Sequence, residues 1–541
     1  MAKRPRNKML DKAVGHTLDK TTLTLRQKVG QLFMPAAFIN DTEEEVQNLE
    51  KLIRDHHIGA ICFFHSRASA ATNFEGKKKI VHNEKSYDRL KQLITRYQKA
   101  AKFPLLVAMD AEWGLAMRIE NTPQYPYAIT LGAMDDGEDL IYSVGYQIGK
   151  DCRQAGIHWN LAPVVDINNN PENPVIGYRS FGDDKKSVLH RSKAYIDGMG
   201  RAGVLNAIKH FPGHGDTAMD SHLGLPVINK SLEELKENEL FPFQELIKKG
   251  VDAVMVGHLS LPQLDSHEPS TTSSIIITDL LRKTMGFGGV IISDALNMHA
   301  VSKKYTEQGG LELAAFTAGM DMLCFSEHAV EGIESILGSA SKERINESFE
   351  RIWHLKEKIF FRELPEESVQ HDPKNLNRQL AQHSLTELYG NPSDVKKIKE
   401  SNFLNLSWNA KVENIFSKRL HEEYGMEAID LMTAHDAFKD KIATSKNLVL
   451  ALFPPAVKPK NLFGFEAEQL KRIKDLIVAK NVLIYLFGNP YAIDILGLGP
   501  TSNIVLIYQD FPEFQEEALR HFKGLLTAKG RLPVQLKTFK A

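Results

Sequence analysis

The sequence predicts an α/β protein that consists of a (β/α)8 TIM-type barrel followed by an α/β sandwich domain. Two observations predict the barrel. Short apolar runs alternate with helix-length amphipathic segments through the first two-thirds of the 541-residue chain, and polar residues collect where these runs end. Strands that alternate with helices form parallel sheets. The second domain is predicted because apolar runs resume after a charged, proline-containing stretch.

Eight apolar runs, many of them rich in β-branched residues, are predicted as the barrel strands. They are Val29–Ala36, Ile58–Phe64, Leu105–Asp110, His158–Val164, Val204–His210, Asp252–Gly257, Val290–Asp294 and Met320–Ser326. The predicted helices between them are Glu43–Asp55, Tyr87–Ala101, Leu140–Ala155, Val188–Ala202, Ser231–Lys249 and Leu311–Ala318. Eight such strand–helix units fit a closed parallel barrel with insertions.

The predicted domain boundaries are 1–361 for the barrel, 362–378 for a linker and 379–541 for the sandwich. The linker begins with the segment Arg362–Lys374, which is charged, contains proline and has no periodicity. The predicted strands of the sandwich are Leu448–Phe453, Val482–Phe487 and Ile504–Tyr508, and its helices include Glu466–Ala479 and Glu513–Thr527.

Composition excludes several classes of partner. The chain has 67 Lys and Arg against 68 Asp and Glu, a net charge of -1, which gives no electrostatic basis for binding nucleic acid. No run reaches the roughly 18 apolar residues of a membrane helix. No apolar region follows the charged N-terminus, so we expect a cytoplasmic protein, although a trimmed exported protein would have the same sequence. The oligomeric state is left open.

Polar residues lie at the carboxyl ends of the predicted strands. They are Asp110, Asn160, Asp166, Lys209, His210, His258 and Asp294. Barrel enzymes place their active sites at this face, because the strand ends converge there and the loops can vary. This arrangement predicts an enzyme.

The fifth predicted strand ends in a dense polar loop. Pro212, Gly213 and Gly215 stop any regular element there, so a site is expected at the edge of the sheet. The loop reads Lys209-His210-Phe211-Pro212-Gly213-His214-Gly215-Asp216-Thr217 and is followed by Asp220-Ser221-His222. This pattern resembles the signature loop of glycoside hydrolase family 3. Its Asp-x-His ending resembles the β-N-acetylglucosaminidase branch of that family.

Other segments carry the same resemblance. They are DAEWGLAMR at Asp110–Arg118, NLAPVVD at Asn160–Asp166, NPVIGYRSFG at Asn173–Gly182, ISDALNM at Ile292–Met298 and GRLPV at Gly530–Val534. Two positions depart from the family pattern. Trp113 replaces a usual Gly. Ala295 stands where many members have a second Asp, and this second departure weakens any inference about which sugar is preferred.

The resemblance implies that Asp294 is the nucleophile of a retaining glycosidase, with His222 as general acid/base and Asp220 as its orienting partner. Taken alone, a strand-end Asp more often caps a helix, and an Asp-x-His pair is more often a solvated loop. A carboxylate can form a glycosyl-enzyme intermediate, and an imidazole titrates near neutrality and can both give and take a proton.

The resemblance also implies a small carbohydrate substrate, no cofactor, and terminal GlcNAc as the sugar, from peptidoglycan-derived fragments. The predicted substrate-binding residues are Asp110, Arg118, Arg179, Lys209, His210 and His258. A carboxylate flanked by cations supplies the donors and acceptors that sugar hydroxyls need. Arg118 and Arg179 could instead brace the carboxylates of the site, and His258 could satisfy backbone groups at its strand end.

Four alternatives stay open. One is a metal centre at His210, His214, Asp216 and His222, although Pro212 and the glycines remove the helical spacing that would aim two imidazoles at one ion. A β-glucosidase or β-xylosidase of the same family would use a different acid/base. A phosphorylase would replace water by phosphate. A sugar-binding protein without catalysis would have no need of Asp294, Asp220 and His222 together.

Overall fold

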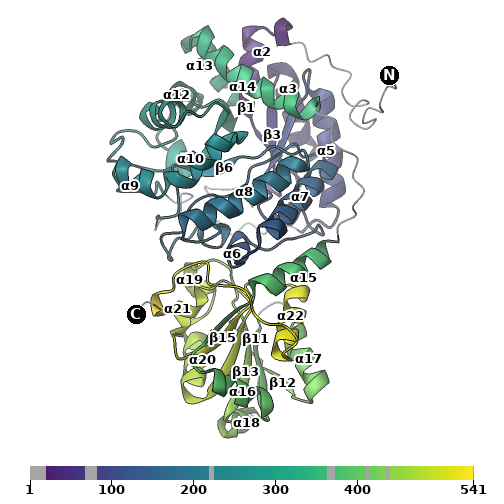
Figure 1. Cartoon of the computed structure of the whole chain (residues 1–541). Helices are drawn as coiled ribbons and strands as arrows, with labels where there is room; N and C mark the ends of the chain where they lie inside the picture. Colours follow the sequence, from purple (N-terminus) through teal and green to yellow (C-terminus); the bar gives the residue numbers. More distant parts are fainter. Residues whose placement is uncertain are drawn as a thin grey trace, which may run out of the picture. The chain divides into compact units, whose positions relative to one another are not determined.

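The computed structural model describes residues 20–67, 82–217, 224–361, 372–409, 413–433 and 438–539. The chain divides into two compact units (Figure 1). The barrel unit comprises 1–124, 142–166 and 192–369, and the sandwich unit comprises 125–141, 167–191 and 370–541. The predicted barrel domain, 1–361, includes 125–141 and 167–191. In the structure these segments pack with the C-terminal residues, as when the N–H of Arg531 donates to the carbonyl of Ala133 at 2.8 Å.

The barrel unit contains a ring of parallel strands. They are β1 (Phe33–Met34), β2 (Ala36–Phe38), β3 (Ala60–Phe64), β4 (Leu106–Met109), β5 (Trp159–Asn160), β6 (Ile208–Phe211), β7 (Ala253–Val256), β8 (Val290–Ser293) and β9 (Leu323–Cys324). The strands β2 to β5 and β6 to β8 pair in sequence order, and β1 pairs with β9. Parallel bridges Trp159–Leu205 and Ile292–Met322 join the remaining neighbours. The ring therefore closes, which confirms the predicted barrel.

Helices lie outside the strands of this unit (Figure 1). They are α2 (Leu25–Gly30), α3 (Glu43–His56), α5 (Ser86–Ala100), α7 (Glu138–Ala155), α8 (Lys185–Arg201), α9 (Leu232–Glu237), α10 (Leu240–Lys249), α11 (His299–Ser302), α12 (Gly310–Ala318), α13 (Ala329–Ser339) and α14 (Lys342–Phe360). A π-helix, Ile275–Thr284, which the sequence did not indicate, precedes β8.

The structure corrects one predicted strand at its start and divides one predicted helix in two. The predicted strand Val29–Ala36 starts too early, because Thr24 and Gln27 form a capping box that starts α2, and this helix runs to Gly30. The predicted helix Ser231–Lys249 is two helices, because Asn238 has φ −123° and ψ −79°, outside the helical region.

The sandwich unit contains a six-stranded sheet in the order β10-β15-β14-β13-β11-β12. Its strands are β10 (Thr386–Tyr389), β11 (Leu404–Asn409), β12 (Ala428–Asp430), β13 (Asn447–Phe453), β14 (Asn481–Leu486) and β15 (Asn503–Leu506). Only β10 is antiparallel to its neighbour. Its helices are α6 (Ala128–Gly132), α15 (Pro373–Ser384), α16 (Pro392–Glu400), α17 (Ile415–Tyr424), α18 (Lys439–Thr444), α19 (Lys460–Phe463), α20 (Ala467–Ala479), α21 (Ala492–Leu496) and α22 (Pro512–Phe522). This is the predicted α/β sandwich.

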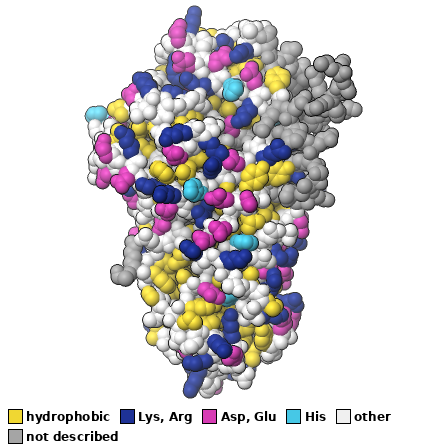
Figure 2. Space-filling view, viewed as in Figure 1, with side chains coloured by type: hydrophobic (Ala, Val, Ile, Leu, Met, Phe, Trp, Pro, Cys, Tyr) yellow, Lys and Arg dark blue, Asp and Glu magenta, His cyan; other side chains and the backbone are white. Residues whose placement is uncertain are grey.

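The predicted linker 362–378 includes residues 362–371, which lie outside the described residues. Asp372 caps α15, which begins at Pro373 within the predicted range. Among the described residues, no helix combines the length and the apolar character needed to cross a bilayer. On the face shown in Figure 2, basic and acidic side chains are interspersed, as the near-zero net charge leads one to expect.

Candidate active site

A cluster of charges lies at the carboxyl ends of β4 and β6. Asp110 directly follows β4, and Lys209 lies in β6. The Nζ of Lys209 is 2.7 Å from Asp110 Oδ1 and 2.8 Å from Glu112 Oε1. The guanidinium of Arg118 donates to Asp110 Oδ2 at 3.0 Å and lies 5.3 Å from the centre of the Phe64 ring. The structure therefore brings together three of the predicted substrate-binding residues.

Burial and charge act in opposite directions on Asp110. Burial alone would raise the pKa of this carboxyl group, but the charges of Lys209 and Arg118 outweigh it and hold the pKa below its usual value. Asp110 is thus a carboxylate held between two cations. Such a group can accept hydrogen bonds from sugar hydroxyls while its neighbours donate them.

A second polar cluster connects β6 with Asp166, which lies just after the fourth predicted strand, His158–Val164. Asp166 is fully buried, and its Oδ2 is 2.7 Å from His210 Nδ1. Its Oδ1 accepts from the backbone N–H groups of His210 at 3.1 Å and His214 at 2.8 Å. Burial would raise the pKa of Asp166, but the charge and hydrogen bond of His210 lower it. Asp166 therefore fixes the orientation of the His210 ring and the start of the signature loop.

Asp294 directly follows β8, and its backbone N–H donates to the carbonyl of Val256 at 3.0 Å. The N–H of Ala295 donates to its Oδ1 at 2.7 Å. Burial alone would raise the pKa of Asp294. The charges of His258 and His210 and the N–H of Ala295 outweigh burial and lower the pKa to about 2. Asp294 is accordingly an anion at neutral pH, as a nucleophile must be.

His258 is buried, and protein groups engage both of its ring nitrogens. Nε2–H donates to the carbonyl of Ala295 at 2.9 Å, and Nδ1 lies 2.5 Å from the hydroxyl of Thr271. Of the two roles that the sequence left open for His258, these contacts favour the support of backbone next to Asp294 over direct contact with a sugar.

Three further predicted site residues are not tested by these contacts. Arg179 lies in the sandwich unit, at the end of a 3-10 helix (Gly177–Arg179), and its guanidinium is 3.5 Å from the carbonyl of Val175. Its predicted sugar contact stays a prediction. Asp220 and His222 lie outside the described residues, so their predicted acid/base role also stays a prediction.

Sequence reasoning missed two contributors to this region. Glu112 shares Lys209 with Asp110, and its place two residues after Asp110 in the same motif was the available signal. His214 was treated only as a loop residue or metal ligand. Burial, together with the charge of His210, lowers the pKa of His214 to about 4, so it is a neutral imidazole that hydrogen-bonds Thr217 at 2.8 Å. Among the described residues, no group of three or more His, Cys, Asp or Glu side chains has the arrangement of a metal site.

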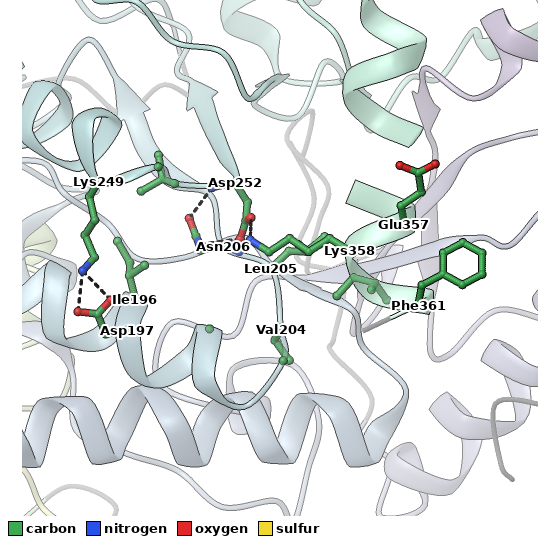
Figure 3. Close-up of a pocket in the computed structure, with 15 residues that line it drawn as sticks. Ile196, Asp197, Val204, Leu205, Asn206, Lys249, Asp252, Glu357, Lys358 and Phe361 are labelled. Carbon is green, nitrogen blue, oxygen red and sulfur yellow. Dashed lines mark hydrogen bonds and ion pairs between the residues drawn. The ribbon is translucent and has the colours of Figure 1, made fainter. Parts of the chain in front are cut away.

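A pocket of about 510 Å³ lies elsewhere in the barrel unit (Figure 3). Its lining includes Asn206 and Asp252, which precede β6 and β7 and hydrogen-bond each other at 2.7 Å. Lys358 also pairs with Asp252, and Lys249 pairs with Asp197. The pocket is therefore at the amino ends of the strands. The carboxylates of the candidate site are at the other ends.

Comparison with known proteins agrees with this geometry. Residues 24–355 match the family described as "Glycosyl hydrolase family 3 N terminal domain". The chain is 28% identical over 482 residues to "Beta-hexosaminidase A" of Pseudoalteromonas piscicida, covering 80% of this chain and 77% of that protein. It is 38% identical over 251 residues to "Beta-hexosaminidase" of Tolumonas auensis, covering 45% of this chain and 73% of that protein.

Among solved structures, a glycoside hydrolase family 3 β-N-acetylglucosaminidase from Paenibacillus sp. str. FPU-7 matches with a TM-score of 0.75 and 26% identity. The match covers 96% of this chain and all of that one. The barrel, the strand-end carboxylates and a family match that spans more than half of the chain lead to one conclusion: this protein belongs to glycoside hydrolase family 3.

Proposed function

We propose that this glycoside hydrolase is a retaining exo-β-N-acetylglucosaminidase that removes terminal β-linked GlcNAc. The observation that carries the proposal is the anionic Asp294 at the carboxyl end of β8, whose pKa is lowered to about 2 by charges that include His210. A carboxylate in this setting can attack an anomeric carbon. The proposed sugar is supported by the Asp220-Ser221-His222 pattern and by the names of the similar proteins.

In the first proposed step, an Asp294 oxygen forms a bond to C1 of the sugar, and the bond from C1 to the glycosidic oxygen breaks. His222 gives its proton to that departing oxygen, so the leaving group departs as an alcohol. The charge of Asp294 is consumed in the covalent intermediate, and His222 becomes neutral.

In the second step, water attacks C1 and gives a proton to His222, while the bond from C1 to Asp294 breaks. The sugar leaves with the configuration it had in the substrate, because two displacements at C1 restore it. Asp220 would orient the His222 ring and stabilise its charged form, as the acid of a catalytic triad does.

Asp110, Arg118, Lys209 and His210 would bind the sugar hydroxyls. The first three already form a charge-assisted network, with distances of 2.7 and 3.0 Å to the Asp110 oxygens. Because the protein holds these groups in place before binding, little ordering is needed when the substrate arrives. The proposed natural substrates are fragments derived from peptidoglycan.

The test is hydrolysis of p-nitrophenyl β-N-acetylglucosaminide, measured beside the β-glucoside and the β-xyloside with and without phosphate. We expect the N-acetyl sugar to be preferred and the rate to be independent of phosphate. Preference for the glucoside or xyloside would contradict the proposed specificity. A rate that requires phosphate would show a phosphorylase.

A further inference from the structure

His258 is tied to the residue that follows the proposed nucleophile. It lies just after β7, and Asp294 directly follows β8, the neighbouring strand. The ring is fully buried, and its Nε2 lies 2.9 Å from the carbonyl oxygen of Ala295. A carbonyl only accepts hydrogen bonds, so Nε2 carries a proton and donates it. The imidazole therefore connects the end of β7 to the main chain beside Asp294.

Ala295 in turn holds one oxygen of the Asp294 carboxylate. Its N–H donates to Oδ1 at 2.7 Å. Among the residues that the structure describes, none gives a hydrogen bond to Oδ2, and Asp294 is partly exposed. Oδ1 is thus the oxygen that the protein holds, and Oδ2 is the oxygen left to form the bond to C1.

The peptide group between Ala295 and Leu296 is held at both of its ends. The N–H of Leu296 donates to the carbonyl of Cys324, in β9, at 3.0 Å. The carbonyl of Ala295 accepts from the N–H of Met298 at 3.1 Å as well as from His258. Because β7 and β9 lie on opposite sides of β8, His258 completes the attachment of this peptide group to both neighbouring strands.

Thr271 fixes the ring of His258. Its hydroxyl oxygen lies 2.5 Å from Nδ1 and 3.4 Å from the carbonyl oxygen of Gly257, and the residue is fully buried. With the proton on Nε2, a neutral ring accepts at Nδ1 from this hydroxyl. Thr271 therefore stabilises the tautomer of His258 that donates to Ala295.

His258 also acts on the charge of Asp294. Burial alone would raise the pKa of this carboxyl group. The charge of His258 is the largest influence that opposes burial, followed by His210, the N–H of Ala295 and Lys209, and together they lower the pKa to about 2. His258 is thus electrostatically coupled to Asp294, while protein groups engage both of its ring nitrogens.

We propose that His258 is a positioning residue for the nucleophile. It holds Ala295, whose N–H orients the Asp294 carboxylate so that Oδ2 attacks C1, and Thr271 holds the His258 ring in the donating tautomer. This rests on the proposed function, in which Asp294 attacks C1. A nucleophile that is already held in its reactive orientation loses less freedom on reaching the transition state, so it reacts faster. His258 itself touches no substrate.

The test follows covalent labelling of Asp294 by 5-fluoro-N-acetylglucosaminyl fluoride. A bond forms between an Asp294 oxygen and C1, the C1–F bond breaks and fluoride leaves, so this step needs no proton from an acid. The fluorine at C5 slows the later attack of water, and mass spectrometry measures the labelled fraction over time. The rate of labelling therefore reports on the nucleophile and not on the predicted acid/base.

His258→Phe keeps a ring of similar size but cannot donate to Ala295. We expect the labelling rate to fall about tenfold or more, while labelling still goes to completion. The Ki of GlcNAc should stay within about threefold, because the proposed sugar ligands are other residues. His258→Gln, whose NH2 group can replace Nε2–H, should regain most of the rate. A labelling rate close to that of wild type would overturn the proposal. So would a Ki that rises as much as the rate falls, since His258 would then contact the sugar.

Thr271→Val is the milder second variant, and it carries the test if His258→Phe does not fold. Valine has the shape of threonine but leaves Nδ1 without its donor, so labelling should slow with little change in the Ki of GlcNAc. In the double variant with His258→Phe, the loss of Thr271 should add nothing, because it acts through the missing ring. Labelling of Thr271→Val at the wild-type rate, or losses that multiply in the double variant, would contradict this chain of contacts.

His158→Phe is the matched control. His158 directly precedes β5, at the amino ends of the strands, and its Nδ1 accepts from the N–H of Val107 at 3.1 Å. The same substitution there should lower Tm without slowing the labelling of Asp294. If it slowed labelling as much as His258→Phe does, the effect would be a general loss of packing and the positioning role would fail.

Wild type separates this inference from the proposed function. If the label does not go to Asp294 in wild type, the nucleophile assignment fails, and the positioning role fails with it. If wild type is labelled at Asp294 and His258→Phe is labelled equally fast, only the positioning role fails.

Discussion

Lys209 donates a hydrogen bond to Asp110 across the carboxyl face of the barrel, with 2.7 Å between Nζ and Oδ1. The two residues come from β6 and the end of β4, and β5 lies between these strands. This contact fixes the two proposed sugar-binding groups relative to each other before any substrate binds.

Lys209→Met should damage both stability and catalysis. The side chain of Lys209 is 2% exposed and pairs with both Asp110 and Glu112, so its loss leaves two neighbouring, largely buried carboxylates without the cation that they share. Breaking a buried ion pair by removing one partner costs roughly 3–5 kcal/mol. We expect a clear fall in Tm and a fall of about a hundredfold or more in kcat/KM. If Tm and kcat/KM were both unchanged in this variant, the cluster would contribute to neither stability nor catalysis.

The double variant Lys209→Met/Glu112→Gln serves as the control for that experiment. Removing the Glu112 charge relieves the repulsion with Asp110, so part of the lost stability should return. The activity should stay low, because the donor to Asp110 and to the sugar is still absent. If activity returned together with stability, Lys209 would have a structural role only.

Asp294→Ala should reduce turnover about a thousandfold or more while leaving the thermal unfolding near that of wild type. The side chain is the proposed attacking group, and the pKa of about 2 keeps it charged at neutral pH. Added azide should restore part of the activity on an activated aryl substrate by attacking C1 directly. Because that route has one displacement, the product should have inverted configuration, which NMR detects. A retained product would contradict the nucleophile assignment.

Asp166→Asn tests how His210 is oriented. Oδ1 of Asp166 accepts from two backbone N–H groups and Oδ2 accepts from His210 Nδ1–H. An Asn that keeps its oxygen toward the backbone turns its NH2 group toward Nδ1, so Nδ1 must be unprotonated to accept from this group. We expect KM to rise about tenfold or more and the His210 nitrogen shifts to report an unprotonated Nδ1. A protonated Nδ1 with unchanged KM would remove this role from Asp166.

The strand-end residues were predictable because a parallel barrel converges its carboxyl ends at one face. Asp110, Lys209 and Asp294 each follow or end a recognisable apolar run. Once these runs form a parallel barrel, the three residues are brought to the same face. Glu112 was missed because a carboxylate beside a tryptophan in a loop looks like a solvent-exposed side chain. Its partner, Lys209, is distant in the sequence, and no periodicity relates the two.

Two features of the fold could not be read from local pattern. Val29 and Gly30 belong to an apolar run, and only the capping box of Thr24 and Gln27 reveals that they end a helix. The segments 125–141 and 167–191 fold with the sandwich unit because their partners are C-terminal. For example, Asn168 donates to the hydroxyl of Tyr491 at 2.6 Å, a pairing over 323 residues that no sequence window contains.

The last prediction concerns stability and pH at Lys356, which lies in α14. Its ammonium group is fully buried and donates to the side-chain oxygen of Gln31 and to the carbonyl of Pro104 at 2.6 Å, and burial lowers its pKa to about 7. In the unfolded chain the pKa of a lysine is about 10.4. Between these two values the unfolded state holds more protons than the folded state, so stability rises with pH across this window.

Lys356→Met removes that titration and should therefore change the pH dependence of unfolding in a defined direction. The free energy of unfolding of wild type, minus that of the variant, should increase by about 2 kcal/mol between pH 7 and pH 9. Lys358→Met, whose lysine pairs with Asp252 near the same helix end, is the matched control for the loss of a lysine side chain from α14. Denaturant titrations at several pH values measure the difference. A difference that stays constant with pH would mean that Lys356 keeps its proton in the folded protein, and its hydrogen bonds to Gln31 and Pro104 would then have to stabilise a buried cation.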